Sequence, residues 1–186
     1  LPSWLGLPSI HTRHWDPFFQ ACEETSTVLA MHIGSGTKTV TTSPDAPTVV
    51  AANLIACNSV ASMVDWLFSG VFDRFPGIQL LYAESQIGWI PYFVERADDT
   101  WQTHQWAQGE ERSQRPPSDY YREHISACFF KDTVGIDLLD RIGEDNVLFE
   151  TDYPHQDGTF PRSKQVAEEL FGHLPQPTIN KIARGN

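Results

Sequence analysis

Several features that mark common protein classes are scarce or absent in this sequence. Only three of its 186 residues are cysteines, and Cys22, Cys57 and Cys128 lie far apart and form no CxxC pair. This spacing supports neither a disulfide framework nor a zinc site built from cysteines, and it fits a reducing compartment. We therefore expect a cytoplasmic protein.

Basic residues are few and form no cluster. The sequence has 13 Lys and Arg against 24 Asp and Glu, which gives a formal net charge of −11. No run of basic residues could neutralise a phosphate backbone, so nucleic acid is not an expected partner. We also identify no signal peptide and no apolar stretch near the ~18 residues of a membrane span, so a membrane is not an expected partner either.

Motifs for several common chemistries are missing as well. No GxGxxG or Walker-type loop occurs, so nucleotide cofactors are not implied, and no GxSxG elbow presents a nucleophilic serine. Large side chains are plentiful, since 12% of the residues are aromatic and 40% are hydrophobic. Such a composition allows a sizeable core and favours an enzyme with a pocket.

Short apolar runs alternate with segments of helical periodicity along the chain. The predicted strands are 27–32, 78–83, 125–130 and 147–151, and the predicted helices are 17–24, 51–71, 87–101, 133–142, 162–171 and 178–183. The first strand is almost wholly apolar, as expected for a strand covered on both faces. Residues 102–118 are polar, contain adjacent prolines and are predicted to be a surface excursion. Repeated strand–helix units predict an α/β fold with a parallel sheet, and four units are roughly half of a (β/α)8 barrel of about 250 residues.

Three ionisable residues stand where predicted strands end. His32 is the last residue of the first strand, Glu84 follows the second, and Asp152 follows the fourth. Parallel α/β folds build their active sites at this edge of the sheet. A lone histidine here is more often a hydrogen-bonded core residue, but a divalent metal would satisfy an imidazole and carboxylates together.

The segment ETDYPHQDGTFP concentrates polar groups after the fourth strand. It contains Asp152 and His155 within a few residues of Pro154 and Gly158. One interpretation is a polar turn fixed by the proline and the glycine. The alternatives are that His155 holds a substrate carboxylate or that it pairs with Asp152, and the spacing does not choose between them.

Five blocks of the sequence resemble successive blocks of the amidohydrolase-related family, which includes aromatic and enoic acid decarboxylases. They are LGLPSIHTRHWDPFFQACEE, VLAMHIGSG, FDRFPGIQLLYAESQIGWIPYFVERADD, GEDNVLFETDYPHQDGTFP and KIARGN, and together they cover nearly the whole chain. The resemblance implies a distorted (β/α)8 barrel, with residues 1–186 forming the C-terminal part of one such domain, strands five to eight. Members bind one divalent metal, usually zinc or manganese, through a His-x-His at strand one, a His at strand five and an Asp at strand eight. By this resemblance His32 and Asp152 are metal ligands.

The sequence departs from the family pattern at two places. Many members have a histidine at the end of strand six, where this chain has Glu84, and no His-x-His occurs, since His11 and His14 are three apart and are expected to be loop residues. Two protein ligands seldom hold a catalytic metal. We therefore expect a fragment of a longer enzyme, an expectation that the missing initiator Met and the ending at ARGN also favour.

For the intact enzyme the resemblance implies a metal-dependent carboxy-lyase acting on a small aromatic or unsaturated carboxylic acid. Asp152 and Glu84 would handle protons, and His155 would bind the substrate. A hydrolase acting on a C–C, C–N or ester bond is the alternative within the family. A non-catalytic half-barrel is the alternative outside it, and its open sheet edges would favour association, so a homo-oligomer is a further expectation.

Overall fold

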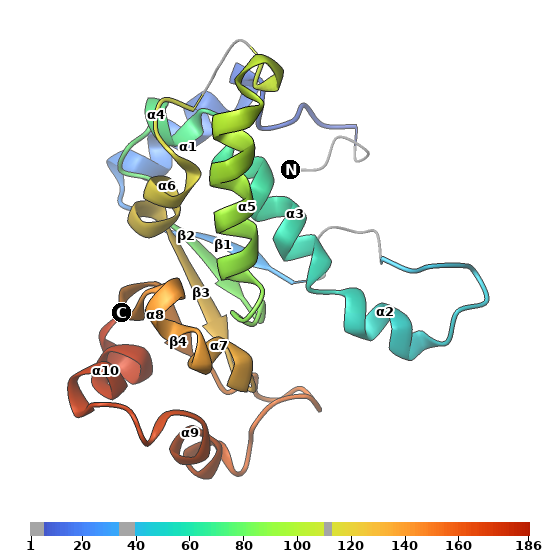
Figure 1. Cartoon of the computed structure of the whole chain (residues 1–186), viewed down its shortest axis with the longest axis vertical. Helices are drawn as coiled ribbons and strands as arrows, with labels where there is room; N and C mark the ends of the chain where they lie inside the picture. The colour runs from blue at the N-terminus through green and yellow to red at the C-terminus, as the bar shows by residue number, and fades with distance from the viewer. Residues whose placement is uncertain (1–5, 34–39, 110–112) are drawn as a thin grey trace.

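The protein is built around one parallel sheet. A computed structural model describes residues 6–33, 40–109 and 113–186. Its four strands are β1 (Leu29–His32), β2 (Leu80–Ala83), β3 (Ile125–Phe129) and β4 (Val147–Phe149), and they lie side by side in chain order (Figure 1). Each strand falls within a predicted one and each neighbouring pair is parallel, which confirms the α/β prediction and the arrangement of half a barrel.

The two faces of the sheet are buried to different degrees. On the outer face, pairing aligns residues that are at most 1% exposed in the last three strands: Tyr82, Ala127 and Val147. On the inner face, the register aligns His32 with Ala83 and Cys128 with Leu148, and His32 is exposed. The prediction that the first strand is covered on both faces is wrong, because β1 alternates between half-buried and exposed residues. The inner face of a barrel is enclosed only by a complete ring of strands.

Helices cover the outer face of the sheet. α3 (Cys57–Leu67), α5 (Ile90–Thr103) and α6 (Pro117–His124) pack against one another there (Figure 1). The remaining elements are α1 (Asp16–Glu24), α2 (Thr48–Leu54), α4 (Val71–Arg74), α7 (Thr133–Asp137), α8 (Leu139–Ile142), α9 (Ser163–Phe171), α10 (Gln176–Asn180), a π-helix at Lys181–Gly185, and 3-10 turns at Arg13–Trp15, Gln105–Ala107 and Glu144–Asn146.

The segment predicted as one helix over 51–71 is divided into α2, α3 and α4. Gly70 has a φ of 68°, a left-handed conformation that ends the helical path. The Ser69 hydroxyl accepts a hydrogen bond from the Val71 N–H at 3.1 Å, and α4 begins there. Apolar spacing continues through these bends, so periodicity alone did not reveal them.

The predicted surface excursion over 102–118 is partly wrong. Ser113 is 5% exposed, and its hydroxyl donates to the Leu67 carbonyl at 2.9 Å. α6 was not predicted, although Pro117 stands at its first position, where a missing N–H costs nothing. α6 ends at His124, which is 2% exposed, stacks on Phe72 at 4.4 Å between ring centroids and has a structural role in the core.

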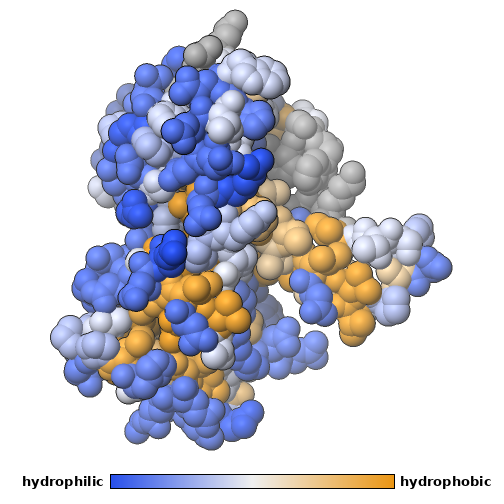
Figure 2. Space-filling view, in the orientation of Figure 1, coloured by the Kyte–Doolittle hydropathy of each residue, from blue (hydrophilic) through white to orange (hydrophobic). Residues whose placement is uncertain are grey.

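An apolar arm projects from the body of the molecule. It comprises α2 and the start of α3, and Figure 2 shows hydrophobic residues gathered over it. No residue of α2 is buried, and Val49 is 66% exposed. Residues Thr48–Leu67 are long and apolar enough to cross a membrane by length and composition, a stretch that the sequence analysis overlooked. Met63, Trp66 and Leu67 at the end of this stretch are buried in the core, but only 11% of its 18-residue apolar window is buried.

Candidate functional site

The predicted site residues lie at the carboxyl edge of the sheet. His32 ends β1, Glu84 directly follows β2, and Asp152 and His155 belong to the loop after β4. His32 Nε2 lies 2.9 Å from Glu84 Oε1. His155 Nδ1 lies 2.8 Å from Asp152 Oδ1 and 3.8 Å from Glu84 Oε1. The four side chains therefore form one chain of contacts, with Glu84 at its centre.

Two carboxylates and an imidazole in this group suit a divalent cation. One donor atom each from Glu84, Asp152 and His155 lies within 4.8 Å of the other two. Oxygen and imidazole nitrogen are ligands that zinc and manganese both accept. His32 is not in this group of three, and it reaches the group through Glu84. That His32 and Asp152 share one ion remains a prediction.

The electrostatics of His32 also favour a cation at this position. Its Nδ1 lies 2.7 Å from the Ile33 carbonyl, which can only accept, so Nδ1 carries a proton. In a neutral ring, Nε2 would then present a lone pair to the Glu84 carboxylate, and the two acceptors would repel each other. The bond to Ile33 raises the pKa of His32, burial opposes that shift, and Glu84 raises the pKa further. A proton or a metal ion between the two side chains relieves the repulsion.

Both site carboxylates follow their strands in an uncommon backbone conformation. Glu84 has a φ of 56° and Asp152 a φ of 53°. The left-handed region costs a non-glycine residue roughly 1–2 kcal/mol, and such residues concentrate at functional sites. Around Asp152, a tight loop holds the backbone, because the His155 N–H donates to the Asp152 carbonyl at 2.9 Å. A Cβ on Gly158 would lie 2.6 Å from that carbonyl oxygen, so the loop requires glycine there.

Asp132 fixes the loop that carries Glu84. Its carboxylate accepts hydrogen bonds from the N–H groups of Ile87 at 2.7 Å and Gly88 at 2.6 Å. The same carboxylate caps α7 through the Gly135 N–H at 2.7 Å. The loop after β2 is thereby tied to the loop after β3.

Glu150 is a further carboxylate of the site, and sequence reasoning gave it no role. It lies between β4 and Asp152, and its Oε1 accepts the Glu84 N–H at 2.7 Å. Burial raises the pKa of Glu150, the hydrogen bond from the Glu84 N–H opposes that shift, and the charges of Glu84 and Asp152 raise the pKa further. Burial and the neighbouring Glu150 raise the pKa of the Cys128 thiol to about 12. Strand alternation could have identified Glu150 as a site residue, because Leu148 and Glu150 are two residues apart and share the inner face.

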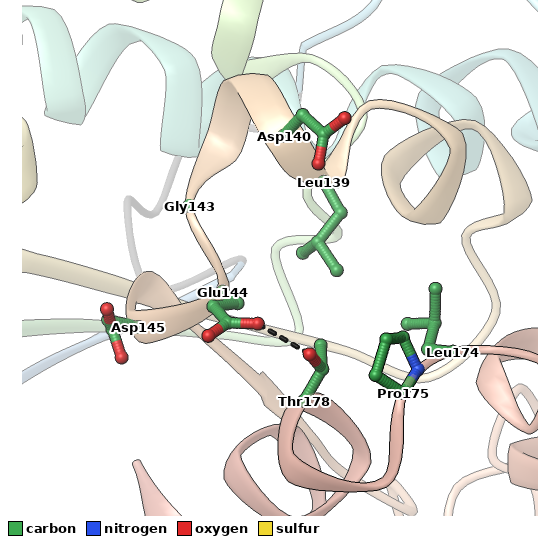
Figure 3. Close-up of a pocket in the computed structure, with 8 residues that line it drawn as sticks. All are labelled: Leu139, Asp140, Gly143, Glu144, Asp145, Leu174, Pro175 and Thr178. Carbon is green, nitrogen blue, oxygen red and sulfur yellow. Dashed lines mark hydrogen bonds between the residues drawn. The ribbon is translucent and has the colours of Figure 1, made fainter.

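Two cavities in the described residues lie away from this group. One, of about 430 Å³, lies beside the turn that leads into β4, where Glu144 accepts a hydrogen bond from Thr178 (Figure 3). The other lies between the end of β4 and α9. Neither contains His32, Glu84, Asp152 or His155. An open half-barrel does not enclose its mouth, so the convergent donor atoms at the strand ends lie outside both cavities.

Four parallel β/α units, with two carboxylates and an imidazole that could hold a metal ion at the strand ends, define a partial (β/α)8 barrel with a candidate metal centre. The chain belongs to the amidohydrolase family, whose model matches residues 1–186.

Solved structures of similar fold extend this comparison. An amidohydrolase from Mycobacterium avium subsp. paratuberculosis K-10 is 21% identical, with a TM-score of 0.74 over 95% of this chain and 45% of its own. The 5-carboxyvanillate decarboxylase of Sphingomonas paucimobilis is 18% identical, with a TM-score of 0.72 over 96% and 53%. A dihydroxybenzoic acid decarboxylase from Polaromonas sp. JS666, solved with manganese and 2-nitroresorcinol, is 17% identical, with a TM-score of 0.69 over 95% and 53%. This chain spans about half the length of these proteins.

Proposed function

We propose that the chain forms part of a metal-dependent carboxy-lyase that acts on a small aromatic or unsaturated carboxylic acid. The observation that carries the proposal is the group formed by Glu84, Asp152 and His155, whose donor atoms lie within 4.8 Å of one another. Two of the similar structures are decarboxylases of aromatic acids by name, and both have the same fold. A metal-dependent hydrolase is the alternative, since the family is named for amide hydrolysis.

The residues at the strand ends fit one divalent ion, zinc or manganese. We propose that Asp152 and His32 bind it, as the family resemblance implies, with Glu84 and His155 beside them. A divalent ion there would supply Lewis acidity and would orient an anionic substrate. The manganese in the Polaromonas structure makes manganese the first ion to test.

The chain's own side chains can bind the substrate and move protons. Glu84 lies 2.9 Å from His32 Nε2, so its carboxylate stands beside the proposed metal ligand and can carry a proton there. Glu84 can hold the proton that replaces the departing carboxyl group on carbon. The imidazole of His155 is 61% exposed, so it can meet a substrate carboxylate at the mouth.

Further parts of the proposal concern the whole protein. We propose that residues 1–186 are the C-terminal part of a single barrel domain and that the remaining metal ligands lie outside this chain. We also propose a cytoplasmic protein that associates with its own copies, binds a small carboxylate and uses neither nucleic acid nor a membrane as a partner. The rival is a non-catalytic half-barrel, which would bind no metal.

Metal analysis and turnover of the full-length protein test this function. We expect about one divalent ion per chain in the wild type and CO2 release from a hydroxybenzoate or an enoic acid in a substrate panel. Asp152→Ala should lower the metal content, because it removes one of the few protein ligands that hold the ion. Asp157→Ala, which removes an exposed carboxylate from the same loop, is the matched control and should keep it. Absence of bound metal from the wild type would refute the enzyme proposal, and ester or amide turnover without CO2 release would favour the hydrolase.

A further inference from the structure

A single side chain connects the first and last parts of the candidate site. Glu150 Oε1 accepts the backbone N–H of Glu84 at 2.7 Å, and the two residues are 66 positions apart. The bond joins the end of β2 to the end of β4 and so passes over the end of β3, where the Cys128 thiol lies close to the Glu150 carboxylate. Glu150 itself is held by the sheet, because its N–H donates to the Phe129 carbonyl at 2.9 Å.

The bond from Glu150 holds the Glu84 backbone, whose conformation sets the direction of the Glu84 side chain. Glu84 has a φ of 56°, and a residue in this region turns its side chain away from the direction of the strand. In this conformation the carboxylate meets His32 at 2.9 Å and faces His155 at 3.8 Å. An extended backbone at Glu84 would point the carboxylate elsewhere. The backbone conformation at this one residue therefore sets the contacts of the site.

Other bonds hold the loop further from Glu84. Asp132 binds the N–H groups of Ile87 and Gly88, which begin three residues later. The Gln86 side chain accepts the Phe130 N–H at 3.4 Å, a long bond. The Ile33 N–H donates to the Ala83 carbonyl at 3.3 Å, and among the bonds described for this loop the one to Glu150 is the one made by the Glu84 N–H.

We propose that Glu150 is a positioning residue, which acts by holding the Glu84 backbone so that the Glu84 carboxylate lies in the cation site with Asp152 and His155. The inference rests on the proposed metal site. Position 150 then needs a side-chain oxygen that accepts the hydrogen bond at a fixed distance from the backbone, and it does not need a negative charge.

Two substitutions of Glu150 distinguish the effect of side-chain length from the effect of charge. Glu150→Gln keeps an oxygen acceptor at the same distance and removes the charge. Glu150→Asp keeps the charge and draws the acceptor back by about 1.5 Å, the length of one carbon–carbon bond. Both are small changes that leave the side chain polar. Glu95→Gln, at an exposed carboxylate on α5, controls for loss of one negative charge.

The measurement is Mn²⁺ affinity of the full-length protein by calorimetry. We expect Glu150→Asp to weaken binding by about 10- to 100-fold, as loss of partners that orient ligands does, and Glu150→Gln to bind like the wild type and the Glu95→Gln control. In a Glu84→Ala background, Glu150→Asp should cause no further loss, because the residue acts through Glu84. Weak Mn²⁺ binding by Glu150→Gln together with normal binding by Glu150→Asp would overturn the proposal. A further loss of affinity on adding Glu150→Asp to Glu84→Ala would overturn it as well.

A second measurement without metal separates this inference from the proposed function. Hydrogen exchange at the Glu84 amide should be slow in the wild type and in Glu150→Gln, and fast in Glu150→Asp. Equal protection in all three would overturn the positioning role even if the protein binds Mn²⁺. A wild type that binds no Mn²⁺ would overturn the proposed function and, with it, the role of Glu150 in a cation site, whatever the exchange result.

Discussion

Truncation of Asp132 should destabilise the protein and disturb the site together. The carboxylate accepts three backbone N–H groups, from Ile87, Gly88 and Gly135, at 2.6 to 2.7 Å. A hydrogen bond to a charged acceptor contributes about 1.5–3 kcal/mol, and a helix cap about 1 kcal/mol. The contributions do not add fully, and Asp132 is only half-buried, so water replaces part of what is lost. We expect Asp132→Ala to lower the free energy of unfolding by about 2–4 kcal/mol, a large part of the 5–15 kcal/mol typical of a domain.

Urea denaturation of the full-length protein measures this loss. Asp132→Asn keeps one acceptor oxygen and should lose about half as much as the alanine variant. Asp137→Ala, an exposed carboxylate on the same short helix, is the control and should stay within about 0.5 kcal/mol of the wild type. A loss below about 1 kcal/mol for Asp132→Ala would refute the reasoning, because it would mean that water satisfies the freed amides as well as the carboxylate does.

Three further predictions concern other parts of the molecule. At pH 8, iodoacetamide should label the exposed Cys57 in the native protein but not the buried Cys128, whose thiol has a pKa of about 12; mass spectrometry that finds native labelling at Cys128 would contradict its burial. The Lys181 ammonium lowers the pKa of Glu144 below its ordinary 4.5. This pair should therefore stabilise the fold above pH 4.5 and lose its effect as the pH falls through the lowered pKa. Glu144→Gln should remove that pH dependence from thermal unfolding, and an unchanged profile of melting temperature against pH would show that the pair contributes nothing. Phe72→Ala should lower stability by about 3–5 kcal/mol, since Phe72 is 3% exposed and stacks between aromatic rings, and a loss below about 1 kcal/mol in urea denaturation would contradict that packing.

Much of the fold was accessible from local sequence pattern. All four strands fall within predicted segments, because a short apolar run bounded by loop residues is itself the signal of a parallel strand, although β1 proved to be only partly covered. The predicted site residues emerged in the same way, since His32, Glu84 and Asp152 stand where those runs end. The bends that divide α2, α3 and α4 and the start of α6 were missed, because apolar spacing does not record a change of helix direction and adjacent prolines suggest a loop as readily as a helix start.

The sequence by itself determined which residues reach the carboxyl edge of the sheet, because strand ends follow from patterns a few residues long. Only the tertiary structure decided which of them meet. The contact of Glu84 with His32 and His155, and the bond from Glu150 to the Glu84 backbone, depend on strand order, register and a φ of 56° at one residue. These contacts are not visible in a local pattern, since each of them joins segments that are far apart along the chain and come together only when the sheet is assembled.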